Sequence, residues 1–259
     1  MKTVTLAAVV LCAAAFAQDA GVPAAPAAEP AADPVTQLDL LWKTRDEPAA
    51  IKATDAAISA GLKANPDDYQ VLWRAARFRW WQADGTVEGQ EKLKKQLGKE
   101  AWNLADRALK VKSDGKEAHY YVALGVGAYS QAVGVLTALS EGLEGKFVEN
   151  LDYAIKADET FDTAGPHRAK GRYHWELPWP KRDLAKSKSE LEAAIKLSPQ
   201  HLRNYYYLAD TYLKDGNAKE AKVQITKVLT GNGDWDPPEA RRVKGWAKAL
   251  SAKIDEELK

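Results

Sequence analysis

The clearest pattern of apolar and polar positions lies in residues 190–222, where apolar side chains recur every three or four residues. One stripe closes just before Pro199, and a second, which includes Leu208 and Tyr212, closes just before Gly216. This spacing is that of amphipathic helices, and Pro and Gly mark the turns between them. The segment therefore predicts the end of one helix, a turn, a second helix, a turn and the start of a third.

The same alternation of apolar stripes and breaks continues from Val35 to Lys259 and divides this part of the chain into five helix pairs. In each pair, the first helix has a large apolar residue beside a small one, and the second carries alanines and ends near a turn. The breaks are at Pro48, Asn65-Pro66, Asp84-Gly85, Ser113–Gly115, Gly165-Pro166, Pro178–Pro180, Ser198-Pro199, Asp215–Asn217 and Gly231–Pro238. Residues 237–258 add a last helix with one apolar face, as expected of a capping helix.

This pattern resembles the tetratricopeptide repeat (TPR), a helix–turn–helix unit of about 34 residues. It predicts an all-α fold, namely a TPR-like right-handed solenoid of about five helix pairs plus a C-terminal capping helix. Such arrays form concave binding surfaces.

Two insertions interrupt the regular repeat, at Asp84–Gly98 and at Val122–Gly145. The second begins with 18 residues, Val122–Leu139, that carry no charge. A membrane span and a buried central helix both fit this composition; the polar residues and glycines within it favour the buried helix. Gly125, Gly127 and Gly134 are expected to let neighbouring helices approach closely.

The N-terminus has the pattern of a secretory signal peptide at residues 1–17, with Lys2, an apolar run and the A-x-A site Ala15–Ala17. Residues 18–34 are rich in Ala and Pro and predict an extended linker, so the repeat domain is placed at 35–259. The expected location is periplasmic. Attachment to the outer membrane as a lipoprotein through Cys12 is the less favoured alternative, because Leu11 is a poor lipidation signal.

Cleavage after Ala17 removes the only Cys and the only Met. The mature chain then has no thiol for a disulfide or a thiolate metal site. It also balances 36 basic residues with 36 acidic ones, which argues against nucleic acid as a partner and against binding to anionic membranes. No cofactor or metal motif is present, and no known catalytic motif supports an enzyme; His167 and His174 lack a suitably spaced carboxylate or thiolate.

A more specific resemblance rests on residues 117–161 and 167–199, and especially on the block GRYHWELPWP at Gly171–Pro180. The order HR-x-x-GR-Y, an aromatic and Pro-rich loop, and a helical hairpin ending in Pro resembles the TatT family, the periplasmic T components associated with TRAP transporters. The layout is also similar to the regulator-of-microtubule-dynamics family. The TatT resemblance implies an adaptor, compatible with a homo-oligomer, that works beside a TRAP solute-binding subunit in the uptake of an organic acid.

The concave face of such an array comes from the first helix of each pair. With Ala76, Gly125, Gly171 and Ala209 aligned, the residues expected on this face are Trp73, Arg77, Trp80, His119, Val126, Tyr129, Arg168, Arg172, Trp175, Arg203, Tyr206 and Asp210. Arginine forks suit carboxylates, and aromatic walls suit apolar groups. A small acidic ligand or an acidic peptide is therefore the expected partner.

Structural roles compete with this interpretation. Arg168 and Arg172 also suit ion pairs within the protein, and tryptophans in repeat arrays mostly pack in the core. Trp179, held between Pro178 and Pro180, is either an exposed anchor for a partner or a residue tucked over the next hairpin. The leading hypothesis is a TatT-like periplasmic binding protein, and the alternative is a general scaffold for protein–protein interactions in the cell envelope.

Overall fold

The structure, a computed structural model, describes residues 33–259. The predicted signal peptide 1–17, Cys12 and residues 18–32 of the predicted linker lie outside the described residues. The first helix begins at Pro34, the last residue assigned to the linker, and Asp33 caps it by accepting a hydrogen bond from the Thr36 N–H.

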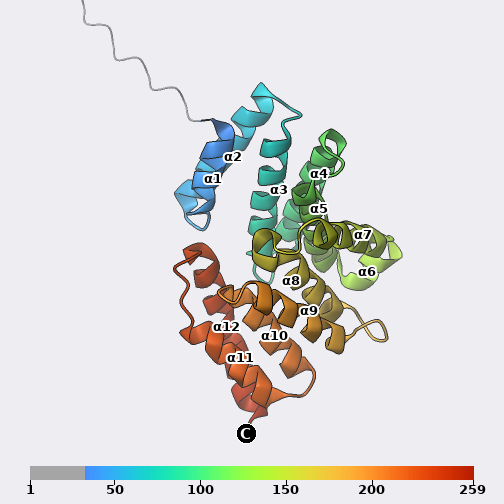
Figure 1. The fold of residues 1–259 in the computed structure, drawn as a ribbon, viewed down its shortest axis with the longest axis vertical. Coiled ribbons are helices and arrows are strands. Elements are labelled where there is room, and N and C mark those ends of the chain that lie inside the picture. The colour runs from blue at the N-terminus through green and yellow to red at the C-terminus, as the bar shows by residue number, and fades with distance from the viewer. Residues whose placement is uncertain (1–32) are drawn as a thin grey trace, which may run out of the picture. The chain divides into compact units, whose positions relative to one another are not determined.

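Residues 33–259 form twelve α-helices and no strand (Figure 1). They are α1 (Pro34–Trp42), α2 (Pro48–Ala64), α3 (Tyr69–Asp84), α4 (Glu91–Val111), α5 (Lys116–Val133), α6 (Val135–Ser140), α7 (Leu143–Ala157), α8 (Phe161–Glu176), α9 (Leu184–Leu197), α10 (Leu202–Lys214), α11 (Ala218–Thr230) and α12 (Pro237–Glu257).

The helices pair as the sequence predicted. The pairs are α1 with α2, α3 with α4, α5 with α7, α8 with α9, and α10 with α11, and α12 then covers the last pair. The first helices also contact one another in order, from α1 through α3, α5, α8 and α10 to α12. The predicted all-α repeat fold of five pairs and a capping helix is confirmed, with α6 as an additional short helix.

The helix starts follow from local chemistry. Asp68, Asp183, Asn217 and Asp236 each lie directly before a helix and accept hydrogen bonds from its first free N–H groups. Such caps satisfy donors that have no partner inside the helix. The start of each of these four helices is therefore indicated by the residue type directly before it.

The uncharged segment Val122–Leu139 departs from the prediction of a single buried helix. The α5 part is deeply buried, but Gly134 adopts a φ of 92° and ends it, and the short α6 follows. Within residues 33–259, no helix is long and apolar enough to cross a membrane.

The glycines of this segment have different roles. A Cβ on Gly125 would lie 2.5 Å from the backbone nitrogen of Trp102, so this glycine does allow α4 and α5 to approach closely. A Cβ on Gly127 would lie 3.2 Å from the ring of Phe147 in α7. The expectation for Gly134 was wrong: nothing approaches it within 3.9 Å, and its role is the positive φ of the turn.

The predicted break at Gly165-Pro166 lies slightly earlier, at three residues with left-handed backbone inside α8. Asp162, Thr163 and Ala164 have φ values of 49°, 54° and 60°. Non-glycine residues rarely adopt this conformation, so the surrounding contacts must hold it. Arg168 supplies them, because its guanidinium donates to the backbone oxygens of Thr163 and Asp162 at 3.0 and 3.1 Å.

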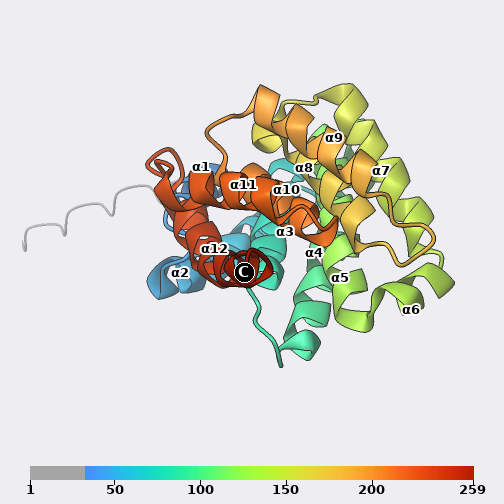
Figure 2. The same cartoon turned by 90° about the horizontal axis from the view of Figure 1, so that it is seen from below.

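The start of α12 lies against the turn between α1 and α2 and the end of α3 (Figures 1 and 2). We call this region the closing contact. Its charged members are Arg45, Asp46, Asp84, Arg203, Asp236, Glu239, Arg241 and Arg242. It joins residues that are up to 195 positions apart in the chain.

Candidate functional site

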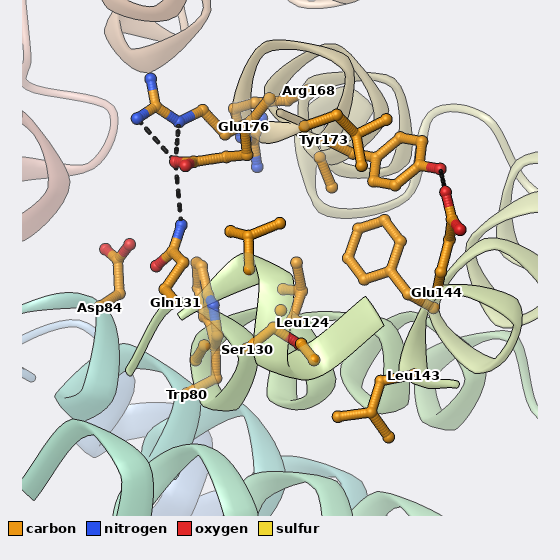
Figure 3. A pocket seen from close by; sticks show the side chains of 18 of the residues that line it. Trp80, Asp84, Leu124, Ser130, Gln131, Leu143, Glu144, Arg168, Tyr173 and Glu176 are labelled. Carbon is orange, nitrogen blue, oxygen red and sulfur yellow. Dashed lines mark hydrogen bonds and ion pairs between the residues drawn. The ribbon is translucent and has the colours of Figure 1, made fainter. Parts of the chain in front are cut away.

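A cavity of about 140 Å³ lies on the face formed by the first helices, between α3, α5, α8 and α10, with α6 and α7 as a further wall (Figure 3). We call it the central cavity. Its apolar lining comprises Trp80, Tyr120, Leu124, Val135, Leu139, Leu143, Phe147, Leu177 and Tyr207, among others. Leu139, Leu143 and Phe147 are half-buried, so apolar surface remains open inside the hollow.

The two sides of the central cavity are joined by hydrogen bonds across its edge. Gln131 of α5 donates to the Glu176 carboxylate at 3.2 Å, and Arg172 donates to the same carboxylate oxygen at 2.8 Å (Figure 3). On the other side, the Tyr173 hydroxyl donates to Glu144 at 2.8 Å, and Lys181 forms an ion pair with Glu144. The polar groups at the edge are thus already partnered.

Four of the predicted site residues line the central cavity, namely Trp80, Arg168, Arg172 and Arg203. The structure also places Trp175 and Asp210 nearby: the Arg172 guanidinium lies over the Trp175 ring at 3.6 Å and forms an ion pair with Asp210 at 2.6 Å. Tyr206 packs against the ring of Trp246 in α12.

The other predicted residues have structural contacts elsewhere. Trp73 is buried and stacks on Tyr121. Arg77 forms an ion pair with Asp39 at 3.0 Å. Val126 is buried in the core.

His119 and Tyr129 contact second helices of pairs. The His119 ring hydrogen-bonds to Asn150 of α7 at 2.7 Å. The Tyr129 ring packs edge-on against Trp102 of α4. Neither residue lines the central cavity.

Trp179 is the most exposed large apolar residue in the described part of the chain, at 86%. It lies in the loop between α8 and α9, where Lys181 reaches Glu144 at the edge of the central cavity. The alternative of a Trp tucked over the next hairpin is therefore wrong.

Each cavity arginine is already in an ion pair. Arg168 pairs with Asp162 at 3.1 Å, and Arg172 pairs with both Glu176 and Asp210. Arg203 is 2% exposed and binds Glu239 through two hydrogen bonds of 2.5 and 2.8 Å. Arg168 and Arg172 therefore form ion pairs within the protein, which is the structural role expected of them as the alternative to ligand binding.

Burial and pairing fix the charge states around the cavity. Burial opposes ionisation of Asp84, but Arg203 and Arg242 outweigh it and hold the pKa of this carboxyl below its usual value. Lys181 and Tyr173 likewise keep the pKa of Glu144 low. Burial raises the pKa of the Tyr120 and Tyr207 hydroxyls. At neutral pH, Asp84 and Glu144 are therefore charged, and Tyr120 and Tyr207 are neutral.

The described residues contain no cluster of three His, Cys, Asp or Glu side chains able to hold a metal ion.

The sequence pattern did not identify the apolar wall of the cavity. Leu139 lies in α6, between the helices of pair three, and Leu143 begins α7; neither was assigned a place in the repeat, whereas Phe147 was assigned to the second helix of this pair but not to a cavity. The signal that could have found Leu139 and Leu143 is the glycine-containing insertion Val122–Gly145 itself, because a regular repeat needs no such segment.

The fold and the arrangement of its inner helices define a TPR-like helical repeat protein, a class that commonly serves as a scaffold for protein–protein interactions and is typically non-enzymatic. The chain belongs to the family described as regulator of microtubule dynamics protein 1-3, which matches residues 35–234. Among solved structures, it is similar to TTC0263, a thermophilic TPR protein of Thermus thermophilus, with a TM-score of 0.61. That match has 19% sequence identity and covers 84% of this chain and 98% of the other. No curated protein matches the chain.

Proposed function

We propose that the protein is an exported adaptor that holds a ligand with a substantial apolar body in the central cavity. The observation that carries this proposal is the half-buried apolar wall of Leu139, Leu143 and Phe147 inside a hollow of about 140 Å³. Ligand pockets are typically apolar with a few positioned polar groups. Leu139 and Leu143 of this wall belong to the insertion Val122–Gly145, which departs from the regular repeat and gives the cavity a side that a plain TPR array lacks.

An organic acid is the ligand class that the edge of the cavity favours. The Glu176 carboxylate lies between Gln131 and Arg172, in a position that a ligand carboxylate could take. The guanidinium fork of Arg172 suits a carboxylate in either case. The ligand acid would therefore compete with Glu176, and Glu176→Gln is expected to increase the affinity for such an acid.

A TRAP-type solute-binding subunit is the proposed partner, and the periplasm is the proposed location. The support is the leader-like pattern of residues 1–17 and the TatT-like block Gly171–Pro180. This block lies at the edge of the cavity, where Arg172 and Tyr173 contribute to the site and Trp179 is exposed. An exposed Trp on a short loop suits a docking anchor.

Filling the central cavity tests the proposal. Native mass spectrometry of the purified full chain should detect a retained ligand, and Leu139→Trp should abolish its retention because the larger ring occupies the hollow. Leu136→Trp is the matched control, because Leu136 lies in the same short helix, is 72% exposed and does not line the cavity. Equal retention of the ligand by both variants would show that the central cavity is not the binding site.

The partner is tested separately. Capture of a TRAP solute-binding subunit by the wild-type protein, weakened by Trp179→Ala, is the expected result. Cell fractionation of the full chain should place it in the periplasm. If the protein retains the ligand but captures no TRAP component, the proposed role in transport is rejected and the proposed ligand binding is kept.

The second candidate is a general scaffold for cell-envelope proteins. It is favoured by the exposure of two large apolar residues, Trp179 at 86% and Leu136 at 72%. For a scaffold, Trp179→Ala would weaken capture of envelope proteins while Leu139→Trp would leave it unchanged.

A further inference from the structure

Three lysine ammonium groups lie over two neighbouring aromatic rings where α5 contacts α4 and α7 (Figures 1 and 2). Lys99 Nζ lies 3.4 Å from the centre of the Trp102 ring and 5.8 Å from that of Tyr129. Lys95 Nζ lies 5.7 Å from the Tyr129 ring, and Lys146 Nζ lies 5.1 Å from the Trp102 ring. We call these five residues the lysine cluster. Because the two rings are themselves 6.1 Å apart, the three positive charges share one small area.

Close helix packing fixes the two rings beneath the ammonium groups. A Cβ on Gly98 would lie 2.7 Å from the backbone nitrogen of Tyr129, so α4 and α5 meet closely at this point. Trp102 Nε1 donates a hydrogen bond to Asp106 at 2.6 Å, and the Trp102 ring packs edge-on against Tyr129. The lysine cluster is therefore built on the packed part of two helices, and both rings are half-buried.

Lys95 and Lys99 have no ion-pair partner among residues 33–259, because the carboxylates nearest to them in the chain bind elsewhere. Both lysines are exposed and lie four positions apart on α4, a spacing at which like charges repel. Glu91 lies one turn before Lys95 but accepts a hydrogen bond from a backbone N–H of the preceding loop. Glu100, directly after Lys99, pairs with Arg79 at 3.1 Å.

Asp106 is the one carboxylate that pairs with the lysine cluster in the described part of the chain. Lys146 binds it at 2.9 Å, and the Trp102 indole donates to the same oxygen. One negative charge therefore faces three positive ones, and the cluster keeps a net positive charge. A bound anion would offset the repulsion between the ammonium groups, because its attraction acts on all three at short range.

The side chains of the lysine cluster indicate which anion fits. Inside the protein, carboxylates are held by arginine forks, as Glu239 is by Arg203. A lysine ammonium is instead a compact point charge with three donors, and it commonly binds phosphate groups. The ammonium groups also cover the two rings, which leaves little ring surface on which a ligand could stack. The ligand would therefore be recognised by its charge.

We propose that the lysine cluster is a surface site for a diphosphate group. The phosphate oxygens accept hydrogen bonds from Lys95 and Lys99, and Lys146 adds a third positive charge. Tyr129, which the repeat alignment assigned to the concave face, belongs to this site as part of its floor. No member of the cluster lines the central cavity, so this proposal is independent of the proposed function.

Titration calorimetry of the full chain with pyrophosphate and with inorganic phosphate, at an ionic strength of about 0.01 M, tests the proposal. Pyrophosphate is expected to bind about tenfold or more tightly than phosphate, because it brings more negative charge to the three ammonium groups. Adenosine diphosphate should bind no more tightly than pyrophosphate, since the covered rings offer no stacking surface. Absent pyrophosphate binding, equal binding of the two inorganic anions, or tighter binding of the nucleotide would overturn the proposal.

A pair of double variants separates this site from the overall charge of the protein. Lys95→Gln with Lys99→Gln should weaken pyrophosphate binding by about tenfold or more, because two of the three ammonium groups are lost. Lys248→Gln with Lys253→Gln is the matched control, since it removes the same charge from exposed positions of α12. The control should leave binding unchanged. Equal weakening in both double variants would show that binding follows net charge and would overturn the proposal.

Nuclear magnetic resonance of the unsubstituted protein provides a test that does not depend on the folding of a variant. Addition of pyrophosphate is expected to shift the indole N–H signal of Trp102 and the backbone amide signals of residues 95–102. Shifts confined to another part of the protein, or no shifts, would contradict the assignment.

Discussion

The closing contact and the central cavity share Asp84 and Arg203, yet different forces hold them. The closing contact is built from buried arginine–carboxylate pairs between residues distant in the chain, such as Arg203 with Asp84 and Glu239. The central cavity is bounded by apolar side chains and by helices that approach each other at glycines.

This difference matters for how each region responds to change. Breaking a buried ion pair strongly lowers stability, because removal of one partner leaves the other buried charge without compensation. An apolar wall tolerates changes of shape and loses free energy gradually. The closing contact is therefore suited to fixing which ends meet, and the central cavity to accommodating a ligand.

The largest effect is expected from Arg203→Ala. It leaves Glu239 buried without its cation and Asp84 with Arg242 alone, and it should lower the free energy of unfolding by about 3–5 kcal/mol. Arg241→Ala is the control, because Arg241 is 57% exposed and its pair with Asp46 lies in the same contact. That variant should lose much less stability, because solvent screens an exposed ion pair. Urea unfolding measures both, and equal losses would show that burial does not distinguish the two pairs.

A smaller effect is expected where α4 and α5 meet. Gly125→Ala places a methyl group against the backbone of Trp102 and should cost about 1–3 kcal/mol of stability. Gly245→Ala, in α12, meets nothing within 4 Å and should instead stabilise by about 0.5–1 kcal/mol, as alanine favours helix. Thermal and urea unfolding of the pair check this, and a stabilised Gly125→Ala would disprove the close approach.

The smallest effect concerns His167, outside both regions. The His167 ring donates a hydrogen bond to Glu190 at 2.7 Å, and this bond raises the pKa of His167 above 6.5. Burial acts in the opposite direction but is outweighed. Since the folded-state pKa is the higher one, the stabilisation is complete below about pH 6.5 and is lost as the pH rises through the folded value. His167→Gln should remove this pH dependence, at most about 1 kcal/mol.

Unfolding at about pH 6 and pH 9 measures the difference between wild type and His167→Gln. The comparison is needed because burial lowers the pKa of the neighbouring His174, which has the opposite pH dependence. An identical pH profile for the two proteins would exclude the His167–Glu190 pair as a contributor.

The helices and their pairing were predictable from the sequence because they depend on local signals. Caps such as Asp68 and Asn217, turns such as Asp215-Gly216-Asn217, and apolar stripes at three- and four-residue spacing act within a few residues. The left-handed turn at Asp162–Ala164 was not predictable in this way, because Arg168 holds it from a later part of the helix.

The candidate site was predictable only in part. Alignment on the small residues correctly brought Trp80, Arg168, Arg172 and Arg203 to one cavity, but it also selected His119 and Tyr129, which pack on α7 and α4. The alignment assumes that each first helix presents the same face. In the structure, His119 contacts α7 of its own pair and Tyr129 contacts α4 of the preceding pair, so the first helices do not all present the same face.

The sequence by itself determined the class of fold, the positions of the turns and the irregular segment, since periodicity and capping are local properties of the chain. Only the tertiary structure decided which carboxylate each arginine pairs with, which apolar residues line a hollow, and that the start of α12 meets the turn after α1. Those outcomes depend on contacts between residues as far apart as Asp46 and Arg241, and such contacts have no signature in the pattern of neighbouring residues.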